Sequence, residues 1–116
     1  MIGHQLEKGW VITDGGWMAL SRDRGTANQK VDQGYGLVCD INGQIIDGLW
    51  VSGANQEHGI ISARNPKGFD PKQFPIGTRL RILPNHACPT SAQHPYYYVV
   101  NNSLEVKDRW NRFYGW

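Results

Sequence analysis

The residue types best suited to chemistry occur together in residues 83–90, LPNHACPT, where one residue separates a histidine from a cysteine. This segment follows residues 78–83, in which apolar and charged side chains alternate as they do in a strand. If that period of two continues past Pro84, His86 and Cys88 project from the same face. An imidazole and a thiolate placed in this way could bind one metal ion, and zinc suits this pair best. The alternative is a buried cysteine beside a hydrogen-bonded core histidine.

A second candidate is His58, which lies between Glu57 and Gly59. Glu57 could orient the His58 ring and fix its tautomer for acid–base catalysis or for metal binding. The alternative is a polar turn in which Gly59 supplies an unusual backbone angle. His58 is therefore a candidate catalytic residue with a purely structural alternative.

Tyr35 is the third candidate, because glycines precede and follow it as Gly34 and Gly36. Glycine on both sides lets the backbone approach another group closely and leaves the phenol accessible for catalysis. The alternative is a kink in a sheet that carries a packed tyrosine.

The segments that must position these side chains have mostly the periodicity of strands. Apolar runs or alternating patterns occupy residues 11–13, 35–41, 44–51, 59–63, 78–83, 96–100 and 104–109. Asn42 and Gly43 predict a tight hairpin turn, residues 101–103 predict a second one, and residues 17–20 could form one helical turn. We therefore predict a single all-β domain over residues 1–116, small and barrel-like, with about six or seven strands and at most one short helix.

Composition excludes several classes of function. The 116 residues carry a formal net charge of only +2, without runs of one sign, which argues against nucleic-acid binding. No apolar run approaches the ~20 residues of a membrane span, and the first residues lack the apolar region of a secretory signal. The two cysteines, Cys39 and Cys88, are then expected to be reduced in a cytoplasmic protein.

Taken together, the motifs resemble a known family over residues 9–116 of the chain. The family is that of the D-serine dehydratase-like enzymes, pyridoxal-phosphate lyases of the alanine-racemase type, and the similar region is their C-terminal β-domain. The stretches that carry the resemblance are DGGWMALS at 14–21, DQGYG at 32–36, QEHG at 56–59, LPNHACPT at 83–90 and WNRFYGW at 110–116.

The resemblance implies a function for His86 and Cys88, and a location without an assigned individual role for Tyr35 and His58. His86 and Cys88 match a two-ligand zinc site beside the cofactor, where zinc acts as a Lewis acid on the β-hydroxyl of a 3-hydroxy-D-amino acid undergoing β-elimination. Pyridoxal phosphate is the electron sink for the resulting carbanion. Related D-threonine aldolases carry a His-x-Asp pair at this place, so Cys88 favours the dehydratase branch. Tyr35 and His58 belong to segments that face the active-site cleft.

The chain also departs from the family pattern. The cofactor lysine and phosphate site of such enzymes lie on a TIM-type barrel of about 250 residues, which would precede Met1. None of the lysines of this chain matches a Schiff-base motif; they are Lys8, Lys30, Lys67, Lys72 and Lys107. We therefore expect pyridoxal phosphate only in a full-length context, and only weak or partial zinc binding here.

Two functions follow as alternatives. In the first, this is a stand-alone or truncated D-serine dehydratase-like domain that supplies zinc ligands and closes an active site, without being catalytically complete. In the second, it is an independently encoded, non-catalytic β-barrel module that binds a small molecule, a metal or a protein partner. Because the absent barrel would leave apolar groups and strand edges exposed, we also expect a homo-oligomer.

Overall fold

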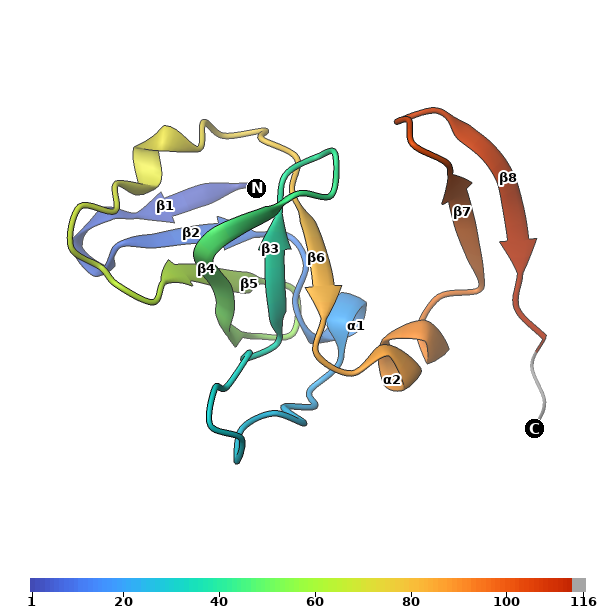
Figure 1. Ribbon diagram of the computed structural model, residues 1–116, viewed down its shortest axis with the longest axis horizontal. Helices are drawn as coiled ribbons and strands as arrows, with labels where there is room; N and C mark the ends of the chain where they lie inside the picture. The colour runs from blue at the N-terminus through green and yellow to red at the C-terminus, as the bar shows by residue number, and fades with distance from the viewer. Residues whose placement is uncertain (114–116) are drawn as a thin grey trace.

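The computed structural model describes residues 1–113, which fold mainly into antiparallel strands (Figure 1). The strands are β1 Gly3–Gln5, β2 Trp10–Thr13, β3 Gly36–Cys39, β4 Ile45–Ala54, β5 Gly59–Ala63, β6 Arg81–Pro84, β7 Tyr96–Val100 and β8 Val106–Asn111. The helical segments are α1 Trp17–Leu20, α2 Ala87–Ala92 and two 3-10 turns, η1 Leu6–Lys8 and η2 Pro71–Gln73. The predicted all-β class is confirmed, although the described residues contain two short α-helices. Of the motif at 110–116, residues 114–116 lie outside the described part.

Six strands form one antiparallel sheet in the order β1-β2-β5-β4-β3-β6. Burial alternates along β2, and the register places Val11 of β2 and Val51 of β4 on either side of Ile61 of β5. One face of the sheet is therefore apolar, as alternation with a period of two predicts. The core consists of Val11, Leu20, Val38, Leu49, Val51 and Ile61.

The sheet curves strongly because β4 bends. Figure 1 shows β1, β2 and β5 running almost perpendicular to β3 and β6, with the ten residues of β4 passing between the two groups. The pairing of β4 with β5 shifts register between Val51 and Gly53, and such irregularities bend a strand. This curvature gives the sheet its barrel-like form.

The curved sheet does not close into a barrel among the described residues, since the edge strands β1 and β6 do not pair. One end is bridged, however. The Met1 amino group donates a hydrogen bond to the Thr78 carbonyl oxygen at 2.7 Å, and the Gly77 N–H donates to the Met1 carbonyl oxygen at 3.0 Å. The segment that leads into β6 thus returns to the start of β1.

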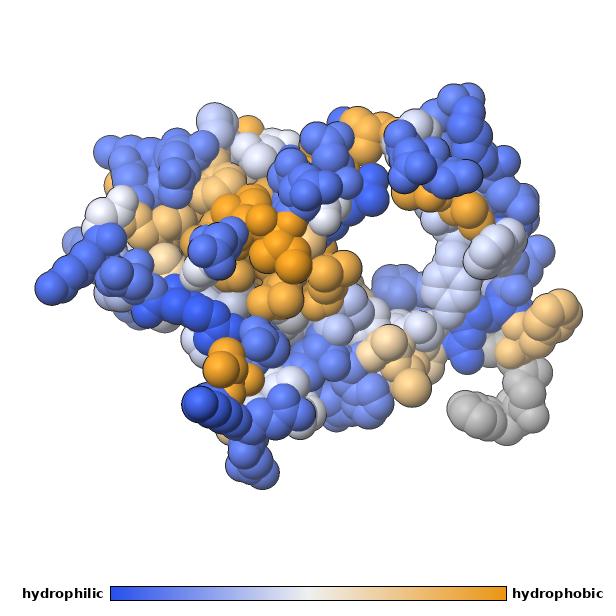
Figure 2. All heavy atoms as spheres, in the orientation of Figure 1, coloured by the Kyte–Doolittle hydropathy of each residue, from blue (hydrophilic) through white to orange (hydrophobic). Residues whose placement is uncertain are grey.

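Both predicted hairpins are confirmed. At the β3–β4 turn, the Asp40 N–H donates to the Gln44 carbonyl oxygen at 2.9 Å, and Gly43 has a φ of +88° that suits glycine. Strands β7 and β8 pair with each other as a separate two-stranded sheet. Figure 2 shows an opening between this hairpin and the body of the protein. Within residues 1–113, neither helix is long and apolar enough to cross a lipid bilayer.

Candidate functional site

The segment that contains the predicted zinc ligands does not continue the strand before it. Strand β6 ends at Pro84, His86 is the N-cap residue of α2, and Cys88 lies in the first turn of that helix. The expectation that a period of two would place His86 and Cys88 on the same face is therefore wrong. The physical reason is local: Pro89 fits the first turn of a helix, and the Thr90 hydroxyl donates to the His86 carbonyl oxygen at 2.9 Å.

The His86 ring has one nitrogen engaged. Its Nδ1 atom lies 2.8 Å from Oδ2 of Asp23, and Nε2 has no hydrogen-bond partner among the described residues. Two residues later, Cys88 presents an exposed free thiol, whereas the other cysteine, Cys39, is buried. The side chain of His86 is 46% exposed, so solvent and ligands have access to the ring.

These donors fit a zinc site that is open. An imidazole nitrogen and a thiolate are preferred zinc ligands, and a carboxylate on the second imidazole nitrogen is the usual support for a metal-binding histidine. Among residues 1–113, no three His, Cys, Asp or Glu side chains gather closely enough to hold a metal ion by themselves. The chain therefore offers two candidate ligands, so other ligand positions would have to be filled by groups from elsewhere. That His86 and Cys88 share one metal stays a prediction.

Asn85 joins the Tyr35 segment to this site. The Asn85 N–H donates to the Tyr35 carbonyl oxygen at 3.1 Å, and the Asn85 side-chain amide donates to the Gly34 carbonyl oxygen at 2.5 Å. A Cβ atom on Gly34 would lie 2.3 Å from the Val51 carbonyl oxygen, so the predicted close backbone approach is confirmed. The Tyr35 side chain is half-buried and packs against the core, with the Arg24 guanidinium 5.8 Å from the ring centroid.

His58 lies at a different place, in the exposed turn between β4 and β5. Its carbonyl oxygen accepts a hydrogen bond from the Asn55 N–H at 2.7 Å, and the Asn55 carbonyl oxygen accepts one from the Trp17 N–H at 2.8 Å. The first residue of helix α1 therefore contacts the turn that contains His58. The helix ends just before the segment that contains Asp23, whose side chain contacts His86. Catalytic roles for Tyr35 and His58 stay predictions.

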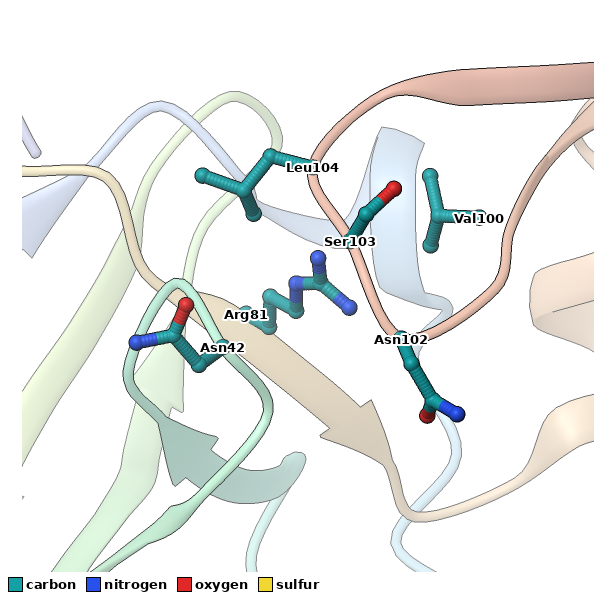
Figure 3. Close-up of a pocket in the computed structure, with 6 residues that line it drawn as sticks. All are labelled: Asn42, Arg81, Val100, Asn102, Ser103 and Leu104. Atoms are coloured by element: carbon teal, nitrogen blue, oxygen red, sulfur yellow. The ribbon is translucent and has the colours of Figure 1, made fainter.

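Two residues with potential function have no signal in the local sequence. Asp23 is 63 positions from His86, and only the folded chain brings the two together. Arg81 is half-buried beside a hollow of about 380 Å³ (Figure 3). Figure 3 shows the Arg81 side chain between the β3–β4 turn, at Asn42, and the β7–β8 turn, at Asn102 and Ser103.

Fold and site together define a small antiparallel β domain in which an exposed histidine and an exposed cysteine lie at the start of a short helix. The chain belongs to the family of the putative serine dehydratase domain, whose sequence model matches residues 1–100. The resemblance inferred from the motifs is thereby confirmed.

The relatives are longer enzymes. The chain is 53% identical over 118 residues to D-threo-3-hydroxyaspartate dehydratase of Delftia sp. strain HT23, covering all of this chain and 31% of that protein. It is 31% identical to D-serine dehydratase of Schizosaccharomyces pombe, over 98% of this chain and 25% of that protein. The chain thus spans about a quarter to a third of the length of these relatives.

Solved structures agree with this family assignment. The Delftia enzyme matches with a TM-score of 0.88 at 54% identity, over 99% of this chain and 31% of that chain. An alanine-racemase-like protein of Idiomarina loihiensis matches with a TM-score of 0.88 at 50% identity, over 99% and 30%. Two further structures of D-threo-3-hydroxyaspartate dehydratase are alanine variants of a cysteine, in a metal-free form, and of a histidine two positions before it.

Proposed function

We propose that this chain acts as the zinc-ligand domain of a D-serine dehydratase-like enzyme, with His86 and Cys88 as the ligands. The reaction would be β-elimination from a 3-hydroxy-D-amino acid, the class to which the substrates named for the relatives belong. The observation that carries the proposal is that an exposed imidazole and an exposed thiol lie two residues apart at the start of α2. Their spacing equals that of the histidine and cysteine replaced in two solved D-threo-3-hydroxyaspartate dehydratase variants, of which the cysteine variant was solved in a metal-free form.

In this proposal the chain's own residues bind and orient. His86 would offer Nε2, because Asp23 engages Nδ1, and Cys88 would offer its thiolate. When bound, zinc supplies a Lewis acid for the substrate's β-hydroxyl group. The Tyr35 and His58 segments would line the side of the active site that this domain closes.

Pyridoxal phosphate does not fit the residues of this chain alone. A Schiff-base lysine is normally sheltered so that its amine can lose its proton, but all five lysines here are exposed. Lys8 lies over the Trp10 ring, and Lys107 pairs with Glu105. We therefore assign cofactor binding to the larger part of a family enzyme. After incubation with pyridoxal phosphate and dialysis to remove the unbound cofactor, the chain alone should show no Schiff-base absorbance. An absorbance that persists and disappears in a lysine variant would contradict this assignment.

A chimera tests the function directly. This chain would replace the matching segment of the Delftia dehydratase, and activity on D-threo-3-hydroxyaspartate would be measured as 2-oxo acid formation. We expect the chimera to be active, and His86→Ala and Cys88→Ser to lower kcat at least 100-fold. Tyr35→Phe and His58→Ala in the same background test the two predicted catalytic residues.

Two outcomes of this experiment would favour the alternative, a non-catalytic binding module. One is a folded chimera without activity, and the other is full activity in both ligand variants. Metal analysis of the purified chain adds an independent measurement. We expect substoichiometric zinc that falls further in Cys88→Ser, because a site with two protein ligands is weak. Stoichiometric zinc that persists in Cys88→Ser would place the metal elsewhere.

A further inference from the structure

The contact between Asp23 and His86 is made by side chains that are both largely open to solvent. Asp23 is 53% exposed and His86 is 46% exposed, and the Oδ2–Nδ1 distance is 2.8 Å. Pairs this exposed contribute little to folding stability, because water screens the attraction and each side chain loses rotational freedom. A structural role therefore gives a poor explanation of why the chain holds Asp23 at this place.

The backbone around Asp23 is held in an unusual conformation. Ser21 is a buried non-glycine residue with a φ of +118°, a region that L-residues rarely adopt. Its hydroxyl oxygen accepts a hydrogen bond from the Asp23 N–H at 3.2 Å, which fixes the start of the Asp23 segment. Backbone strain of this kind persists only where the surrounding structure enforces it, and it is concentrated at functional sites.

Helix α2 is fastened to the same segment from the other side. The Thr90 hydroxyl hydrogen is shared between the His86 and Leu20 carbonyl oxygens, and Nε2 of His94 lies 3.0 Å from the Ala19 carbonyl oxygen. The end of α1 is thereby held against the middle of α2 and the residues that follow this helix. The carboxylate of Asp23 and the ring of His86 are thus brought into contact by two elements that are each tied down.

We infer that Asp23 is a positioning residue that fixes the His86 ring with its hydrogen on Nδ1 and its lone pair on Nε2. A neutral imidazole donates from one nitrogen and accepts at the other, so a carboxylate acceptor at Nδ1 selects this tautomer. Nε2 is then the ring atom left to bind a metal ion. This inference rests on the proposed zinc site and names the residue that prepares its histidine.

The test compares Asp23→Ala and Asp23→Asn with Asp47→Ala, which removes an exposed carboxylate on β4. Zinc affinity of the whole chain is measured by competition with a chromophoric chelator, and the His86 tautomer by ¹⁵N NMR of the metal-free chain at alkaline pH. We expect Asp23→Ala to weaken zinc binding about 10- to 100-fold and to lose the Nδ1–H preference. Asp23→Asn, which keeps an acceptor oxygen, should fall between wild type and Asp23→Ala. Asp47→Ala should match wild type, and all variants should keep the wild-type unfolding temperature within a few degrees.

The outcomes separate the two proposals. If His86→Ala and Cys88→Ser lose zinc but Asp23→Ala binds it within twofold of wild type, the role of Asp23 is refuted and the zinc site stands. If zinc binding survives in both ligand variants, the zinc site is refuted. The tautomer is measured without metal, so this measurement tests Asp23 even if the zinc site is refuted. A His86 ring with its hydrogen on Nε2 in the wild-type chain would refute the role of Asp23.

Discussion

The two thiols of the chain differ in burial, which affects how readily each can form a thiolate and be reached by a reagent. Burial raises the pKa of the Cys39 thiol, and the nearby Asp40 carboxylate raises it further, whereas Cys88 is exposed. Because the thiolate is the reactive species, we expect iodoacetamide at neutral pH to alkylate Cys88 at least tenfold faster than Cys39. Mass spectrometry of peptides from a time course measures both rates. Equal rates in the folded chain would contradict this difference, and Cys88→Ser serves as the control for assignment.

Asp32 supplies a prediction on pH. The hydrogen bond from the Gly34 N–H lowers the pKa of Asp32, with further lowering by Arg24 and Thr26, although partial burial opposes it. A carboxyl group whose pKa is depressed on folding stabilises the folded state above its unfolded pKa of about 3.9. This contribution is lost as the pH falls through the lower, folded value.

We therefore expect Asp32→Asn to lower the unfolding temperature by a few degrees at pH 7, and this deficit to shrink as the pH falls below about 4. Thermal unfolding followed by circular dichroism across that range measures the effect. Asp47→Asn, which alters an exposed aspartate of β4, is the control and should change little at any pH. A deficit that stays constant down to pH 3 would show that charge is not its cause.

How far the candidate site could be predicted differs between its residues. His86 and Cys88 were visible in the sequence because one short motif contains both, and the Gly34–Gly36 pattern indicated a close backbone approach. Asp23 was not visible in the sequence, because it lies 63 positions from His86 and only the fold brings the two residues into contact. The local sequence shows which reactive side chains are present, whereas the tertiary structure determines which other side chains they contact.

At the scale of elements, Gly16 holds α1 against the turn that carries His58. A Cβ atom on Gly16 would lie 2.3 Å from the Asn55 carbonyl oxygen and 2.5 Å from the His58 nitrogen, whereas one on Gly15 would meet nothing within 4 Å. We expect Gly16→Ala to destabilise the fold by about 1–3 kcal/mol, because backbone atoms cannot move aside easily. Gly15→Ala is the matched control and should be nearly neutral. Urea unfolding measures both, and equal effects would contradict the argument.

Elements with strong local signals were predicted well. The Asn42–Gly43 turn, the β7–β8 hairpin and the turn of α1 occur where the sequence placed them. Helix α2 was missed because Pro84, just before it, and Pro89, within it, favour an extended chain. The hydrogen bonding of the Thr90 hydroxyl to the His86 and Leu20 carbonyl oxygens, which holds the helix, is invisible to periodicity. The open edge between β1 and β6 was also beyond prediction, because closure depends on the curvature of the whole sheet.

At the scale of the whole molecule, the β7–β8 hairpin presents large exposed side chains. Tyr98 is 60% exposed, Val106 51% and Trp110 61%. Burial of such side chains against a second copy would be favourable, so we expect a homodimer or a higher oligomer. Light scattering at micromolar concentrations should give a mass above 13.1 kDa. Trp110→Lys should shift the chain toward monomer, whereas Ile76→Lys, on the connection after η2, should not. A wild-type monomer at all concentrations would refute this expectation.

The division of the molecule into a six-stranded sheet and a separate hairpin has a consequence for folding order. All strands of the large sheet lie within residues 3–84, and its Met1–Thr78 bridge joins groups 77 positions apart. During synthesis on a ribosome, the sheet can therefore be completed only after β6 has emerged, and it does not need β7 or β8. The hairpin closes over a few residues, so it can form quickly once its second strand appears. The β7–β8 hairpin can therefore form last, after the six-stranded sheet has folded.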